Sequence, residues 1–240
     1  MKRLLIASLF SVSLYAQSLY YKVKAPIFGT IGEVKVNYNL GSNSYNIDAT
    51  MKTFGFAKTL SGNRVEKYHS EGFVSNNIYK AKYFKQNFSF KRKRGLLEYM
   101  FDYNKKVITK HRKNWKNDKL ISEKKRPLSY FTYNDLFSVY HNIVVQLRNK
   151  PAGNYNIKVA GLEGNRGNLL IKIPPKNVQK QEAKSIGVSN VWIFHIVTHK
   201  KLLKSTNGEV IFAVGDDGIA KGVRVLNTAY VSHLDAVLVR

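Results

Sequence analysis

The sequence contains no cysteine among its 240 residues, which excludes disulfide bonds and thiolate metal sites. Acidic residues are also scarce, since 15 Asp and Glu stand against 40 Lys and Arg and leave a formal net charge of +25. Beyond the first residues, no apolar run approaches the roughly 20 residues of a transmembrane helix. So basic a chain favours anionic partners such as phosphate-bearing lipid, cell-wall polymer or nucleic acid.

The first residues have the composition of a secretory signal peptide. Lys2 and Arg3 form a positive region, an apolar run follows over residues 4–14, and small residues come next at Ala16 and Ser18. We therefore expect a Sec-type signal peptide over residues 1–16, with cleavage after Ala16 or two residues later after Ser18, and a periplasmic location. Because no cysteine follows this segment, we do not expect a lipid anchor.

Residues 17–240 are expected to form a single β-rich domain, since 44% of the chain is apolar and most of it alternates with period two. Residues 33–39 and 45–51 predict a hairpin around Gly41. Short spacing between the runs predicts an antiparallel meander, which is either a curved sheet or a closed, lipocalin-like β-barrel. The further alternating runs are 64–74, 78–85, 88–93, 96–103, 106–112, 155–160, 169–173, 191–198, 209–214, 219–226 and 236–239.

One segment departs from this alternation. In residues 133–147 apolar side chains recur at three-four spacing, which predicts one amphipathic helix with Asn134 or Asp135 near its start and Pro151 beyond its end. We expect its apolar stripe to pack against the sheet or to plug a barrel mouth. Residues 177–188 are polar and weakly patterned, and are expected to form a loop.

The order of these segments resembles an exported bacterial family whose domain has no assigned function. The resemblance implies a periplasmic, β-barrel-like domain similar to lipocalins or lipoprotein carriers, and it supplies no catalytic residue. It is carried by the strand Tyr20-Tyr21-Lys22-Val23-Lys24, Gly29-Thr30-Ile31-Gly32-Glu33-Val34, the strand Tyr45-Asn46-Ile47-Asp48-Ala49, Phe56-Ala57-Lys58-Thr59-Leu60, the turn Ser70-Glu71-Gly72, Tyr99-Met100-Phe101-Asp102 and the helix Asp135-Leu136-Phe137-Ser138-Val139-Tyr140.

Motifs that carry chemistry are weak. His195 and His199 have the spacing of two zinc ligands on a helix, but their surroundings predict a strand, where residues four apart lie roughly 13 Å from each other. Asp216 and Asp217 lie between glycines and are explained by turn chemistry. Nucleophile and phosphate-loop motifs are absent from the sequence. We therefore expect no catalytic residue, no metal and no cofactor.

The strongest functional signal is a basic segment interleaved with aromatic residues. Residues 80–126 contain 17 basic and four acidic residues. We expect a turn at Gly95, which would place the basic residues on either side of it at opposite ends of adjacent strands and form a basic stripe. Solvation of the outer face of the sheet is the alternative explanation. The candidate anion-binding residues are Lys91, Arg92, Lys93, Arg94, Arg112, Lys113 and Lys116.

These observations favour a non-catalytic binding or carrier domain for an apolar or amphipathic anionic ligand. The partner would be anionic lipid, lipopolysaccharide or cell-wall polymer, whereas nucleic acid is disfavoured because the periplasm holds little of it. One alternative is an envelope interaction protein with a solid core and a basic face. A hydrolase with dispersed residues is the third class.

Export gives a first testable prediction. The mature protein should begin at Gln17 or Leu19 and should fractionate with the periplasm, because the signal peptidase removes the segment before it. N-terminal sequencing of fractionated cells measures this directly. An intact Met1 in a cytosolic fraction would contradict it and would favour nucleic acid as the anionic partner.

Overall fold

The computed structural model describes residues 15–162, 166–198, 206, 208–228 and 231–239. The predicted signal segment falls mostly on residues 1–14, outside this part of the chain. The helices are α1 (Gly55–Ser61), α2 (Ser138–Leu147) and α3 (Lys176–Ile186). The strands are β1 (Tyr15–Ala25), β2 (Gly29–Leu40), β3 (Ser44–Thr53), β4 (Val65–Ser75), β5 (Ile78–Phe90), β6 (Lys93–Asp102), β7 (Val107–Lys116), β8 (Lys119–Pro127), β9 (Gly153–Lys158), β10 (Asn168–Ile173), β11 (Trp192–Val197), β12 (Glu209–Val214), β13 (Ala220–Leu226) and β14 (His233–Leu238).

The described strands form one antiparallel sheet of fourteen strands, in the order β8-β7-β6-β5-β4-β3-β2-β1-β14-β13-β12-β11-β10-β9. Sequence neighbours pair as a meander, and the pairing of β1 with β14 joins the first eight strands to the last six. The prediction of a mainly β, curved antiparallel sheet is confirmed. The sheet is open, with β8 and β9 at its edges, so the closed-barrel form of that prediction does not hold.

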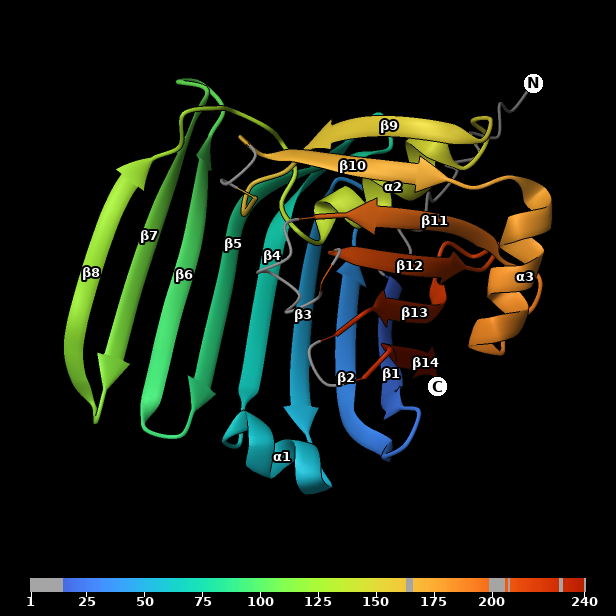
Figure 1. The fold of residues 1–240 in the computed structure, drawn as a ribbon. Coiled ribbons are helices and arrows are strands. Elements are labelled where there is room, and N and C mark those ends of the chain that lie inside the picture. The colour runs from blue at the N-terminus through green and yellow to red at the C-terminus, as the bar shows by residue number, and fades with distance from the viewer. Residues whose placement is uncertain (1–14, 163–165, 199–205, 207, 229–230, 240) are drawn as a thin grey trace, which may run out of the picture.

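The sheet curls over helix α2. Figure 1 shows β9–β12 running across the upper ends of β1–β4 with α2 between them, while β6–β8 stand apart at the left. On one side of α2, Val139, Ile143 and Leu147 pack against strands β10 and β11. On the other side, Tyr140 packs against the cluster formed by β1–β3. The predicted amphipathic helix is therefore confirmed, and its stripe is buried between the two parts of the sheet.

Asp135 sets the start of α2, as the sequence predicts. Its Oδ1 accepts hydrogen bonds from the backbone N–H groups of Phe137 and Ser138, both at 2.8 Å. Its Oδ2 accepts a bond of 2.5 Å from the hydroxyl of Ser70 in β4. Burial raises the pKa of the Asp135 carboxyl group, while these hydrogen bonds act to lower it.

Two buried asparagines extend this polar network across the molecule. The side chain of Asn142 bonds both the backbone N–H and the backbone C=O of Tyr79 in β5, each at 2.8 Å. Its amide also donates to Oδ1 of Asn134 at 2.6 Å. Asn134 in turn donates to the backbone carbonyl of Lys158 in β9 at 2.8 Å. Residues 134–142 thus connect the first half of the sheet to the second.

One sequence expectation is wrong at the level of a single element, and one strand was not predicted. Residues 177–188 were expected to be a loop, but α3 covers most of them and ends at Gly187. Only Gln179, Ala183 and Ile186 of α3 are buried, so its apolar signal is too sparse to stand out. The chain also forms strand β8, which lacks an alternating pattern because neither of its faces is buried.

In the part of the chain that the structure describes, no helix is both long enough and apolar enough to cross a lipid bilayer.

The burial of α2 gives a prediction with a matched control on the same helix. Ile143→Asp and Leu147→Asp should each lower the free energy of unfolding by about 3 kcal/mol or more, because each places an unpaired charge in the core. Val145 is 50% exposed, so Val145→Asp should change the free energy of unfolding by less than about 0.5 kcal/mol. Urea unfolding followed by circular dichroism measures all three. Equal stability of the three variants and the parent would mean that the stripe is not core.

Candidate functional site

The basic residues predicted from the sequence gather at one end of β5–β8. Lys91 and Arg92 form the turn between β5 and β6, with Lys91 at a φ of 49°. Lys93 lies directly opposite Lys116 in the pairing of β6 with β7. The expected turn at Gly95 and the expected separation of the two clusters to opposite ends are therefore wrong. The turn comes four residues earlier, and Gly95 lies inside β6.

Strand alternation divides the candidates between two faces. The face that carries the buried side chains Phe84, Tyr99 and Ile108 is here called the inner face. Residues directly opposite in an antiparallel pair point to the same side. By this register Lys93, Arg112 and Lys116 lie on the inner face, whereas Arg94 and Lys113 lie on the outer face.

The inner face of β7 and β8 carries further cations. Arg112 lies opposite Leu97 on one side and Lys124 on the other. Lys110 lies opposite Tyr99 and Arg126 in the same way. We define the inner basic face by these side chains, most of which are exposed. It consists of Lys93, Lys110, Arg112, Lys116, Lys124 and Arg126.

Aromatic rings form the floor next to these cations. Phe88 and Phe90 of β5 stack with ring centroids 6.0 Å apart. The guanidinium of Arg64 lies over both rings, at 5.5 and 5.4 Å from their centroids. The ammonium of Lys93 lies 5.7 Å over Phe90. The ring of Phe88 covers Gly95, where a Cβ would come within 2.2 Å of it. Because glycine has no Cβ, the Phe88 ring can lie directly against the backbone of β6 at this position.

The inner face of β5–β8 carries no acidic side chain. Residues 78–127 contain four acidic residues, and the register places Glu98, Asp102 and Glu123 on the outer face and Asp118 in a turn. On the neighbouring strand β4 the inner face carries Glu66, which is buried and bonded to Arg64, Tyr68 and the amide of Gln86. The register therefore places no carboxylate of β5–β8 opposite Lys93, Arg112, Lys116 or Lys124.

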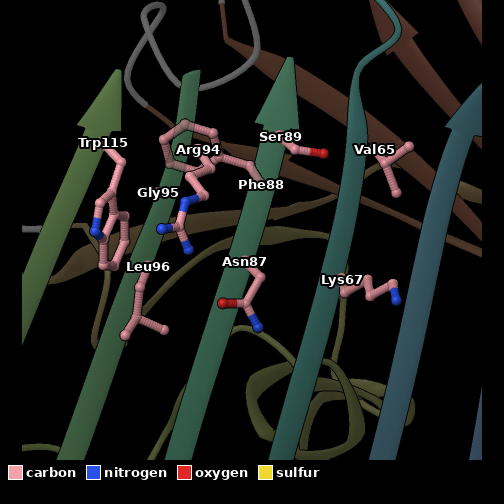
Figure 2. Close-up of a pocket in the computed structure, with 9 residues that line it drawn as sticks. All are labelled: Val65, Lys67, Asn87, Phe88, Ser89, Arg94, Gly95, Leu96 and Trp115. Carbon is pink, nitrogen blue, oxygen red and sulfur yellow. The ribbon is translucent and has the colours of Figure 1, made fainter. Parts of the chain in front are cut away.

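The outer face of the same strands carries charges of both signs, which pair with each other. His111 contacts Glu98 at 3.1 Å and Glu123 at 2.7 Å, and Lys113 contacts Glu123 at 3.0 Å. Hydrogen bonds from His111 and Lys113 lower the pKa of Glu123. The other candidate on this face, Arg94, lies 4.4 Å over the ring of Trp115. Figure 2 shows these two side chains along one wall of a groove on the outer face.

The remaining sequence candidates have structural roles. His195 lies on strand β11, as expected, and is held between Glu182 and Glu209 at 2.9 Å each. Its partner in the zinc-like spacing, His199, lies outside the described residues. Asp217 accepts a bond of 3.0 Å from the backbone of Ile219 in the turn between β12 and β13, which fits turn chemistry.

A serine, a histidine and an aspartate meet at β14, which bears on the hydrolase alternative. Ser232 Oγ lies 3.0 Å from Nδ1 of His233, but Nε2 of His233 is 3.7 Å from Asp235. Two bonds of 2.6 and 2.7 Å from Arg224 engage the Asp235 carboxylate. The carboxylate is thus oriented by an arginine and not by the imidazole, which is not the arrangement of a catalytic triad.

Sequence reasoning missed half of the inner basic face. Lys110, Lys124 and Arg126 were not among the candidates, because β8 was not predicted and the inner side of β7 could not be assigned without it. The sequence does contain one signal for strand β8, which is the pair Asn117-Asp118 between β7 and β8. Both residues adopt the positive φ values of a hairpin turn.

No family model matches the sequence, and no curated protein matches it. Among solved structures, the chain is similar to the crystal structure of a beta-barrel-like protein of a domain of unknown function, DUF1849, from Brucella abortus. The match has a TM-score of 0.52 at 12% identity and covers 96% of this chain and 98% of that one. At this identity the likeness concerns the fold alone. The chain therefore has the β-rich fold of a domain of unknown function, which agrees with the resemblance found in the sequence.

Proposed function

We propose that this chain is an exported, non-catalytic binding domain that holds an amphipathic anion against the inner face of β6–β8. One observation carries the proposal. The inner basic face presents six cations beside an aromatic floor, on strands whose acidic residues all lie elsewhere. Cations recognise the anionic head of such a ligand, and the rings offer contact to its apolar part.

The packing of the interior favours binding on this open face. Helix α2 fills the space between the two parts of the sheet with Val139, Ile143 and Leu147, which are at most 7% exposed. A ligand inside the curl would have to displace these side chains from a packed core. The lower halves of β6–β8, by contrast, have neither α2 nor β9–β12 in front of them (Figure 1).

The chemistry of the ligand follows from the face. Surface cations alone would suit any polyanion, including a cell-wall polymer. Phe88 and Phe90 add an apolar element next to Lys93, and a bare polyanion would make no use of it. Phospholipid with an anionic head group and phosphorylated glycolipid combine both features, and both occur at the bacterial envelope to which we assign the chain.

Vesicle binding with face-matched variants tests the proposal. The inner triple variant Arg112→Gln, Lys116→Gln and Lys124→Gln removes three positive charges, and the outer triple variant Lys85→Gln, Lys113→Gln and Lys125→Gln removes the same number. At about 1 kcal/mol per cation, the inner variant should bind phosphatidylglycerol vesicles about a hundredfold more weakly at low salt. The outer variant should lose less than threefold, and the parent should bind neutral phosphatidylcholine vesicles poorly. High salt should weaken binding of the parent.

Three results would contradict the proposal. Equal losses in the two triple variants would mean that net charge and not the inner face attracts the membrane. Equal binding to neutral vesicles would remove the anion requirement. A third arm uses Phe90→Ser with vesicles and with soluble polyphosphate. If polyphosphate binds as tightly as the vesicles and Phe90→Ser affects neither, the ligand is a polyanion and the aromatic floor has no part in binding it.

A further inference from the structure

The outer groove of Figure 2 lies on the opposite side of the sheet from the inner basic face, and it shares only Phe88 and Gly95 with the aromatic floor of that face. None of the cations of the inner basic face lines the groove, so a ligand in this groove can be tested independently of the proposed function. The groove runs along β5 and has a volume of about 490 Å³, within the roughly 300–1,000 Å³ of small-molecule sites. Two rows of side chains in register across β4–β7 form it. Its polar and aromatic lining is Lys67, Asn87, Phe88, Ser89, Arg94 and Trp115.

Small side chains make the floor and large ones make the walls. Ser89 and Asn87 of β5 lie in the middle, where hydroxyl and amide groups can donate and accept hydrogen bonds. Arg94 of β6 stands on one side of them and Lys67 of β4 on the other, and in Figure 2 the Lys67 side chain extends away from β5 and from Arg94. The strands that carry these two cations are separated by one strand, roughly 9.5 Å in all. An anion held by Arg94 over β5 is therefore within reach of the long Lys67 side chain once that side chain turns toward the groove.

Arg94 is held in place before any ligand arrives. Its guanidinium lies 4.4 Å over the ring centroid of Trp115, and its Nε lies 3.6 Å from Asp118. The Asp118 side chain is 95% exposed, so water screens its charge and little of the positive potential of Arg94 is cancelled. A guanidinium fixed on an aromatic ring presents a planar fork that fits phosphate or carboxylate oxygens.

We infer that the outer groove binds a monosaccharide-sized polyol that carries one phosphate or carboxylate group. Arg94 binds the anionic group, Lys67 turns toward that group when the ligand is bound, and Asn87 and Ser89 bind the hydroxyl groups. No acidic residue is among the residues that line the groove, so nothing within it repels the anion. Val65, Phe88, Gly95 and Leu96 complete the lining, and Val65 and Leu96 contact the carbon–hydrogen faces of the ligand.

Tryptophan fluorescence provides the measurement. The chain has two tryptophans, and the second, Trp192, is 6% exposed in the core. In a Trp192→Phe background, verified as folded by its melting temperature, Trp115 alone reports on the groove. The probes are glucose 6-phosphate, glucuronate, glucose and inorganic phosphate. Glucose 6-phosphate and glucuronate should bind with dissociation constants at least tenfold lower than those of glucose and inorganic phosphate. Comparing glucose 6-phosphate with glucuronate shows whether the groove prefers a phosphate or a carboxylate group.

Variants locate the binding. Arg94→Gln should weaken binding of glucose 6-phosphate at least tenfold, and Lys67→Gln about fivefold. Lys85→Gln, on the same face of β5 but outside the groove, should change it less than twofold. Ser89→Leu should abolish it by filling the floor. Inorganic phosphate binding as tightly as glucose 6-phosphate would overturn the polyol part of the inference. Unchanged binding in Arg94→Gln, or no binding by the parent, would overturn the inference as a whole, whatever the vesicle experiment on the inner face gives.

Discussion

The side chain of Asn142 forms two hydrogen bonds with the backbone of Tyr79 in β5, the fourth strand from the β8 edge of an open sheet. Through Asn134 the same side chain is linked to the carbonyl of Lys158, and through Asp135 the network reaches Ser70. Leaving a buried polar group without its hydrogen-bond partner costs about 1–3 kcal/mol of folding free energy. Because these side chains share partners, breaking one bond of the network would also disturb the geometry of the others. Within the described residues, β8 and β9 are not paired with each other. The curl of the sheet therefore depends on this segment and on the core around α2.

This constraint also decides which surface is available for binding. The segment around Asn134 and α2 draws β9–β12 over the upper ends of β1–β4, and the packed helix occupies the interior that a lipocalin-like barrel would leave to a ligand. The strands beyond β5 extend past this cover. Their inner rows continue the register of the core, but the row that holds Phe84 and Tyr99 in the core ends in Lys110 and Arg126 at the edge. This change from apolar to basic side chains marks the boundary between the packed core and the proposed binding surface.

Much of the fold could be predicted from the sequence because burial imposes a period. Strands β2 and β3 bury alternate residues such as Tyr45, Ile47 and Ala49, and α2 buries one stripe, so both patterns were visible. Strand β8 buries nothing, and α3 rests on Gln179, Ala183 and Ile186 alone, so neither had a clear signal.

The site could be predicted only in part for a related reason. Composition revealed the basic segment, but a sequence gives the face of a residue only once the register is known. A turn at Lys91 in place of Gly95 moved Lys93 next to Lys116 and placed Arg94 on the opposite face. The buried polar network could not be predicted for a different reason. Asparagine is usually a surface residue, so only the tertiary structure shows that Asn134 and Asn142 are buried and which groups they bond.

The absence of cysteine allows a direct test of where the ligand lies, because a single introduced cysteine is the only site that a thiol-reactive fluorophore can label. Asn114 and Thr109 are uncharged residues of β7 on the inner and outer face respectively. Dodecyl phosphate, added below its micelle concentration, should shift the emission of a polarity-sensitive fluorophore at Asn114→Cys to the blue and leave Thr109→Cys unchanged. Dodecyl phosphocholine, which has no net charge, should shift neither. A shift at Thr109→Cys alone, equal shifts at both positions, or equal responses to the two amphiphiles would contradict binding of an amphipathic anion at the inner face.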